Sequence, residues 1–263
     1  MIEMNVILRR IARDFPKRIA KANHDYVGLM TGKKPDKVQK ILLLLDLDWE
    51  ILPKVKEYKP DVIITHHPFI FGTRYRVCKY DESKRLLIEE IDKLGIPVYS
   101  FHTNFDTGRG GMNDALSKAL GLVNVYAPMK NPMMRIGELE SPIEATEFAK
   151  FAKTVFHVDY ALLINSGAKN IKKVGIIGGG GSRSWPLAKE EGCDIYISGD
   201  APHYVRRDIV NAQYNYLDMP HEIEKIFMPT MKELLLELDP TLEIKMVDHE
   251  KLPKVIQYLT ILL

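Results

Sequence analysis

The sequence has few of the features that mark secreted, membrane-spanning or nucleic-acid-binding proteins. It contains 2 cysteines in 263 residues, Cys78 and Cys193, which lie far apart and form no CxxC pattern. This argues against both a disulfide framework and a thiolate zinc site. No apolar run approaches the roughly 20 residues that a membrane-spanning helix needs. Met1–Arg10 has the composition of a charged helix start rather than a signal peptide. We therefore expect a soluble, cytoplasmic protein.

The chain also lacks a strong charge of either sign and a recognisable protein nucleophile. Lys and Arg number 37 against 35 Asp and Glu, a net charge of +2, which argues against a large electrostatic surface for nucleic acid. No serine or cysteine lies in a nucleophile-elbow pattern, and no pair of carboxylates suggests a glycosidase. If the protein is an enzyme, a metal-bound water is the expected nucleophile.

Short apolar β-type runs alternate with helical segments along the chain. The expected strands are 40–45, 61–65, 98–101, 161–165, 174–177, 194–198 and 214–218. The expected helices are 4–20, 51–58, 83–94, 113–121, 142–156 and 229–238. Such alternation predicts an α/β fold with a mostly parallel sheet covered by helices.

The two halves of the chain can be aligned with one another. The strands at 41–44 and 61–65 match those at 174–177 and 194–198 with a constant offset. Further along the chain the offset is 14 residues shorter, which fits a longer loop around 71–80 in the first half, and there His102 matches His221. The match predicts an internal duplication, with two similar α/β lobes at 1–126 and 127–263 and a site in the cleft between them. Because few residues match, chance similarity is the alternative.

The most informative motif is Thr65-His66-His67-Pro68, at the end of a short apolar strand. Ligands of open α/β sheets bind at the carboxyl ends of strands. Neighbouring residues within a strand point to opposite faces, so the alternative is one core and one surface histidine. At a strand end both rings can turn outward, and each could then hold one of two metal ions. Imidazole and carboxylate ligands suit Zn, Fe, Mn, Ni or Co without choosing among them.

Two further clusters carry imidazoles and carboxylates. His102 follows the strand at 98–101, and Asp106 comes next as a natural bridging carboxylate, with a turn or helix-capping role as the alternative. His221 and Glu224 are three residues apart, and so share one face of a helical turn; a solvated helix start is the alternative. His102 is also a candidate general acid/base, because imidazole titrates near neutral pH.

The glycine-rich run Gly178–Gly181 follows the strand at 174–177 and precedes Arg183. Strand, glycine loop and helix together form the layout of a phosphate cradle, with Gly180 and Arg183 as candidate contacts. The run fits neither the dinucleotide fingerprint nor the P-loop, so a tight turn is the alternative.

A second candidate acid/base, His203, lies with Asp200 at the repeat position of the first histidine motif. If the duplication is real, both side chains could face the same cleft from the second lobe. They are candidates for proton transfer or substrate contact. The alternative is a turn aspartate followed by a surface histidine.

With these motifs assembled, the chain resembles the NIF-three-like family, also known as the GTP cyclohydrolase I type 2 family. The resemblance spans nearly the whole chain and is carried by residues 65–71, 102–106, 110–116, 178–181 and 198–200 and by the His221/Glu224 pair. It implies a duplicated α/β unit with C-terminal helices exchanged between the lobes, a dinuclear metal site and a toroidal hexamer. By matching position, it implies two divalent metal ions per subunit held by His66, His67, Asp106, His221 and Glu224.

The chain departs from the family pattern in three places. His24–Leu29 reads His-Asp-Tyr-Val-Gly-Leu where the family usually has Trp-Asp-Asn-x-Gly-Leu. Pro220 replaces the glycine that usually precedes the last histidine. Glu224 follows His221 by three residues where many members have four, which leaves Glu222 as an alternative ligand.

The resemblance implies a metal-dependent hydrolase that acts on a nucleotide-like heterocycle, as in the ring opening of GTP. A non-enzymatic metal (iron) chaperone in cofactor biosynthesis and an oligomeric interaction scaffold are the alternatives. In each case we expect a homo-oligomer with no membrane or nucleic-acid partner. A fold alone does not choose among these functions.

Overall fold

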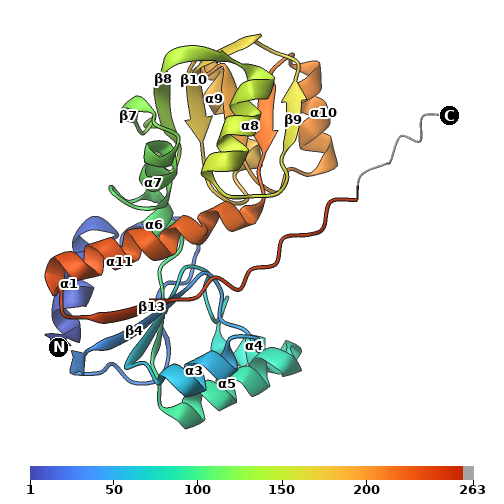
Figure 1. The fold of residues 1–263 in the computed structure, drawn as a ribbon. Helices are drawn as coiled ribbons and strands as arrows, with labels where there is room; N and C mark the ends of the chain where they lie inside the picture. Colours follow the sequence, from blue (N-terminus) through green and yellow to red (C-terminus); the bar gives the residue numbers. More distant parts are fainter. Residues whose placement is uncertain (257–263) are drawn as a thin grey trace. The chain divides into compact units, whose positions relative to one another are not determined.

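The computed structural model describes residues 1–256 and divides into two compact units (Figure 1). The first unit contains residues 1–115 and 224–249, and the second contains residues 116–223 and 250–256. The C-terminal part of the chain therefore returns to the first unit. The predicted duplication, the exchange of helices and the lobe bounds 1–126 and 127–263 stay predictions.

A five-stranded sheet forms the centre of the first unit. Its order is β13 (Glu243–Met246), β4 (Lys40–Leu44), β5 (Val62–Thr65), β6 (Val98–Ser100) and β2 (Gly28–Thr31). The first four strands are parallel, and β2 joins β6 in the antiparallel direction. A small ladder of β1 (Ile2–Glu3) and β3 (Lys37–Val38) stands beside it. Because parallel strands end at one edge, the residues that follow β4, β5 and β6 meet there.

Helices cover this sheet because its strands are apolar on both faces. They are α1 (Met4–Asp14), α2 (Lys17–Ala22), α3 (Leu52–Tyr58), α4 (Arg74–Tyr80), α5 (Glu82–Leu94), α6 (Thr103–Thr107), the start of α7 (Met112–Ala119) and α11 (Phe227–Leu238). Leu42, Leu44 and Ile63 share one core with apolar residues of α3 and α5. In α5, an aspartate N-cap at Asp81 and the left-handed Gly95 set the two ends.

The second unit is built on a six-stranded sheet. Its order is β7 (Val123–Tyr126), β8 (Arg135–Glu144), β10 (Asn170–Ile176), β11 (Ile195–Ser198), β12 (Asn215–Asp218) and β9 (Leu162–Asn165). Only the pairs β10–β11 and β11–β12 are parallel. Helix α8 (Ala145–Val155) lies on one face, and α9 (Trp185–Glu190) and α10 (His203–Asn211) lie on the other (Figure 1). The 3-10 helices are η1 (Ser182–Ser184) and η2 (His221–Ile226).

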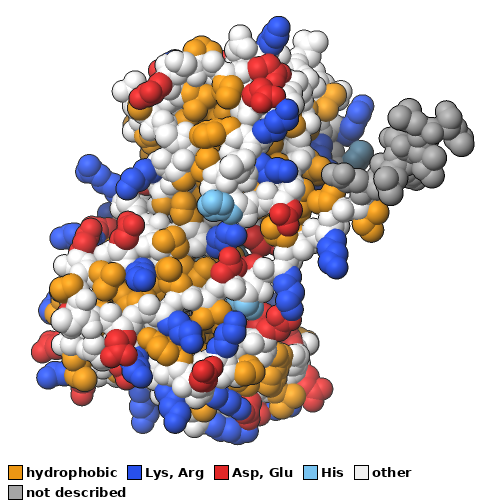
Figure 2. Space-filling model, viewed as in Figure 1, with side chains coloured by type: hydrophobic (Ala, Val, Ile, Leu, Met, Phe, Trp, Pro, Cys, Tyr) orange, Lys and Arg blue, Asp and Glu red, His pale blue; other side chains and the backbone are white. Residues whose placement is uncertain are grey.

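The α/β class and every expected strand are confirmed, but two expectations need correction. The helix expected at 4–20 is interrupted at Pro16, which has no backbone N–H to donate and restricts the residue before it. The sheet is mostly parallel only in the first unit, because β7, β8 and β9 join the second sheet as antiparallel strands. Within residues 1–256, no helix is long and apolar enough to cross a membrane. On the face in Figure 2, acidic and basic side chains are interspersed.

The loop between α6 and α7 depends on a close approach that only glycine permits. A Cβ on Gly111 would lie 1.9 Å from the carbonyl oxygen of Phe105. Phe105 is fully buried, and its ring is 4.7 Å from that of Phe15. The loop therefore holds the backbone of α6, and with it Asp106, in one position.

We expect Gly111→Ala to lower the free energy of unfolding of the first unit by about 3 kcal/mol, because buried backbone must shift to admit the methyl group. Gly110→Ala is the control: nothing lies within 4 Å of an added Cβ, and the left-handed backbone costs about 1 kcal/mol. Urea unfolding followed by Trp49 fluorescence in a Trp185→Phe background reports on the first unit. Equal losses for the two variants would contradict this packing.

Candidate metal centre

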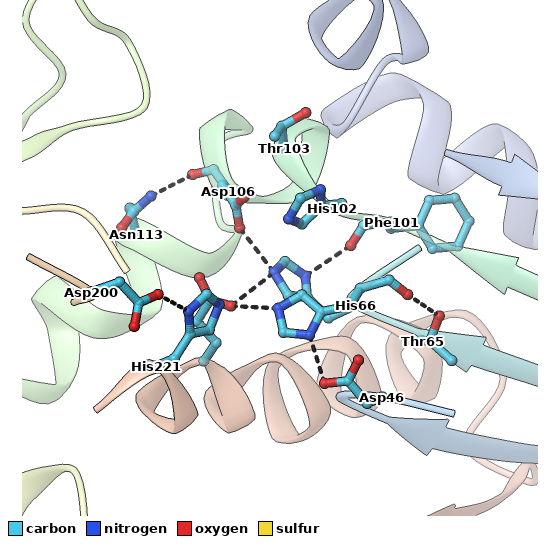
Figure 3. A network of polar contacts seen from close by, with 12 residues as sticks. Asp46, Thr65, His66, Phe101, His102, Thr103, Asp106, Asn113, Asp200 and His221 are labelled. Carbon is cyan, nitrogen blue, oxygen red and sulfur yellow. Dashed lines mark hydrogen bonds and ion pairs between the residues drawn. The ribbon is translucent and has the colours of Figure 1, made fainter. Parts of the chain in front are cut away.

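Three strand ends of the first unit bring ionisable side chains together (Figure 3). Asp46 follows β4, His66 and His67 follow β5, and His102 follows β6. The rings of His66 and His67 are 5.0 Å apart between centroids, and those of His66 and His102 are 5.2 Å apart. Both histidines of the first motif therefore lie in one cluster, contrary to the alternative of one core and one surface residue.

His66 is held as a neutral imidazole with its lone pair directed at acidic groups. Its side chain is 0% exposed, and burial lowers its pKa. Nδ1 donates to the carbonyl oxygen of Phe101 at 2.9 Å, so Nε2 is the unprotonated nitrogen. Nε2 lies 3.4 Å from Oδ1 of Asp106 and 3.5 Å from Oε2 of Glu224. A lone pair facing carboxylate oxygens is repulsive unless a cation or proton lies among them.

The surroundings of Asp106 also indicate that a positive charge belongs among these side chains. Burial raises the pKa of Asp106 well above its usual value, and the nearby negative charge of Glu224 raises it further. Nε2 of His66 and Oδ1 of Asp106 are buried and make no hydrogen bond within the described part of the chain. One imidazole nitrogen and two carboxylate oxygens are a donor set that divalent transition metals accept. His66, Asp106 and Glu224 therefore fit a metal ion.

His67 carries the compensating charge in the metal-free protein. Burial lowers its pKa, but hydrogen bonds to Asp46 and Glu224 outweigh that effect and raise the pKa to about 10. Nδ1 donates to Asp46 Oδ2 at 2.7 Å, and Nε2 donates to Glu224 Oε2 at 2.9 Å. The Nε2 proton lies where a metal ion bound to both His67 and Glu224 would lie.

His102 presents its second nitrogen to the cluster. Nδ1 donates to Asp25 Oδ2 at 2.8 Å, and Asp25 also accepts from the backbone N–H and the hydroxyl of Thr103. Burial raises the pKa of Asp25, but the bonds from His102 and Thr103 outweigh it and hold the pKa below its usual value. Nε2 of His102 is left for a proton or a metal, and His66, His67 and His102 form a second possible metal-binding group.

Two residues of this cluster, Asp46 and Asp25, were not predicted as site residues from the sequence. Each accepts the Nδ1 proton of a histidine, the arrangement that orients metal-binding imidazoles in proteins. Asp46 directly follows the apolar run 41–45, which is a strand-end signal of the same kind as that of His66. Asp25 lies in His24–Leu29, the segment whose sequence departs from the usual family pattern. A carboxylate within reach of an imidazole is recognised only once the strands are assembled.

The helix η2 begins with His221 and contains both candidate glutamates. Glu224 is buried beside the histidines of the first unit, whereas Glu222 is half-exposed. His221 belongs to the second unit, where its Nδ1 lies 2.5 Å from Oδ2 of Asp200. Its role as a metal ligand stays a prediction.

The remaining predicted residues also belong to the second unit. Arg183 lies in η1 and donates from Nε to the hydroxyl of Tyr204 at 2.8 Å. Gly180 precedes it in the loop, where an added Cβ would approach only Asp200, at 3.8 Å. His203 is exposed at the first residue of α10. An anion contact for Gly180 and Arg183 and proton transfer by His203 stay predictions.

Comparisons with known proteins find similarity to one protein family along nearly the whole chain. A model of the Duf34/NIF3 (NGG1p interacting factor 3) family matches residues 2–253. A GTP cyclohydrolase 1 type 2 homolog of Lactococcus lactis is 31% identical over 228 residues, covering 85% of this chain and 88% of the relative. NGG1-interacting factor 3 of Saccharomyces cerevisiae is 26% identical, with 77% and 79% covered. A solved Bacillus cereus protein related to NIF3 has a TM-score of 0.84 at 21% identity, with 97% and 99% covered. Reduced HcgD from Methanocaldococcus jannaschii has a TM-score of 0.79 at 26% identity, with 94% and 98% covered.

Metal binding to the metal-free protein should release the proton of His67. Because that pKa is about 10, His67 is an imidazolium at pH 8, and metal must displace its proton. We expect apparent Zn²⁺ affinity to rise with pH, by about tenfold per unit for this one proton, up to pH 10. Calorimetry in buffers of different ionisation enthalpy counts the protons. His67→Gln should release one proton fewer, and a binding heat that does not depend on the buffer would contradict the assignment.

Proposed function

The chain belongs to the Duf34/NIF3 family, and from that premise we propose that it is a dinuclear-metal hydrolase of the GTP cyclohydrolase 1 type 2 kind, acting on a nucleotide-like heterocycle. The name of the Lactococcus lactis relative supports the reaction class. One structural observation carries the metal: buried Nε2 of His66 and Oδ1 of Asp106 face each other at 3.4 Å without a hydrogen bond. The hexamer implied by the family resemblance stays a prediction.

Two divalent ions would be held chiefly by residues of the first unit. His66, His67, Asp106 and Glu224 are the proposed ligands there, and His221, three residues before Glu224, is the predicted fifth. When bound, such ions supply Lewis acidity and lower the pKa of water. The two carboxylates balance part of the added positive charge, and Asp46 keeps the imidazole of His67 oriented.

His102 is the proposed proton-transfer residue. Asp25 holds its Nδ1 proton, so only Nε2 can give or accept a proton on the side of the cluster. An imidazole that exchanges one proton from a fixed nitrogen is suited to general acid/base catalysis near neutral pH. Asp25 acts through His102 and is a positioning residue.

Burial of the ligands favours a resident metal over delivery to a partner. His66 is fully buried, and the side chains of Asp106 and Glu224 are nearly so. A chaperone needs an exposed and exchangeable site, whereas a hydrolase benefits from ligands that water does not reach. This contrast supports the hydrolase over the iron chaperone.

The purified protein should contain two divalent ions per chain, and Asp106→Asn and His66→Ala should each lose at least one. Asp106→Asn keeps the shape of the side chain, so a loss of metal in this variant reports the missing negative charge rather than a change of fold. His157→Asn, at an exposed left-handed position of the second unit, is the control and should keep both ions. Elemental mass spectrometry measures the content. Full occupancy in both site variants would refute the proposed ligands.

His102→Gln should retain metal and lower kcat for GTP turnover by about 10²- to 10⁴-fold, the contribution of a positioned acid/base. The plot of kcat against pH should lose the limb that this proton transfer gives the wild-type protein. Asp25→Asn should lower kcat less and move that limb. If His102→Gln loses metal in proportion to activity, His102 is a ligand and not the proton-transfer residue.

A further inference from the structure

A cavity of about 570 Å³ opens in the first unit beside the histidine cluster. Helix α2, strand β2, the loop after β5 and the start of α4 form its walls. We propose that this cavity binds the phosphate-bearing part of an aromatic phosphate, with the phosphates against α2 and the ring against Tyr26. The inference rests on the proposed function only in assigning this ligand as the substrate of the neighbouring cluster.

Helix α2 contributes unpaired positive charge to the cavity. Lys17, Arg18 and Lys21 of α2 line it, and within residues 1–256 none of the three forms an ion pair or a side-chain hydrogen bond. Lys17 and Lys21 are one helical turn apart and so share a side of α2. Phosphate oxygens form charge-assisted hydrogen bonds with such side chains. Three free cations on one wall are therefore suited to a di- or triphosphate.

A fourth cation, Arg74, also lines the cavity but is already engaged. Its guanidinium pairs with Asp92 and donates to the hydroxyl of Thr31 at 2.9 Å. The two contacts fix the side chain and use part of its charge. Arg74 therefore bounds the cavity, while the free charge comes from α2.

Glycine at position 28 gives Lys17 its place in this cavity. A Cβ on Gly28 would lie 2.5 Å from Nζ of Lys17, and the backbone there has a φ of +100°. Any other residue at 28 would push the ammonium group away from β2. The ammonium group of Lys17 therefore lies against the backbone of β2.

One aromatic side chain, Tyr26, lines the same cavity and contacts the ring of Phe71 outside the lining. Tyr26 is 41% exposed and Phe71 is 64% exposed, and their rings meet edge to face at 5.8 Å. Exposed aromatic rings beside a basic wall are the common means of binding a nucleobase together with its phosphates. Leu29 and Ile70 add apolar lining.

Asp25 joins this cavity to the histidine cluster. It lines the cavity and accepts the Nδ1 proton of His102 at 2.8 Å. Its carboxylate is negative and would repel phosphate, so the phosphates belong at the α2 side of the cavity. The ring of the ligand then lies toward Asp25 and His102, where the proposed chemistry would occur.

Calorimetric affinities for GTP, guanosine and inorganic triphosphate test the assignment. For the full chain, Lys17→Ala/Lys21→Ala should weaken GTP and triphosphate about tenfold and leave guanosine unchanged. Tyr26→Ala should weaken GTP and guanosine at least about fivefold and leave triphosphate unchanged. The matched control is Lys33→Ala/Lys37→Ala, which removes the same charge from a separate cavity of this unit and should change none of the three.

Equal weakening in the control variant would attribute the effect to net charge and overturn the proposal, as would unchanged GTP binding in Lys17→Ala/Lys21→Ala. Repeating the triphosphate titration with His66→Ala tests whether phosphate binds the metal centre instead. The proposal would also be overturned if His66→Ala lost triphosphate binding while Lys17→Ala/Lys21→Ala kept it. These affinities need no turnover, so a failure of the hydrolase proposal would be seen separately, in metal content and kcat.

Discussion

Two carboxylates and a neutral imidazole meet in the buried part of the first unit. Asp106 and Glu224 both face Nε2 of His66, and charges of one sign in a low-dielectric interior repel strongly. The raised pKa of Asp106 and the proton retained by His67 are two results of this single constraint. A bound divalent cation would remove both effects, the raised pKa of Asp106 and the proton on His67, because it accepts the imidazole lone pair and attracts both carboxylates.

The fold of the first unit explains how such an unfavourable cluster is kept in place. Three parallel strands end at one edge and hold Asp46, the pair His66 and His67, and His102 on a rigid frame. Glu224 comes from far along the chain, and its position depends on α11 and on the pairing of β13 with β4. The apolar cores on the sheet stabilise this arrangement, and so offset the cost of the buried carboxylates.

The same electrostatic constraint relates the cluster to the neighbouring cavity. Asp25 takes the Nδ1 proton of His102 on one side and forms a wall of the cavity on the other. The free cations of α2 line the same cavity, so it holds both positive and negative side chains. A phosphate-bearing ligand would be oriented by these charges before any chemistry occurs.

The sequence by itself determined the α/β class, the strands and the histidines at their ends, because apolar runs and strand-end polar residues are local signals. It left Glu222 as an alternative to Glu224, and in the structure Glu224 lies buried against His67 whereas Glu222 is half-exposed. The roles of Asp46 and Asp25 depended on tertiary structure alone, since each aspartate meets a histidine that is distant in the chain. A strand can be recognised from its neighbours in sequence, whereas a buried charge is defined by its neighbours in space.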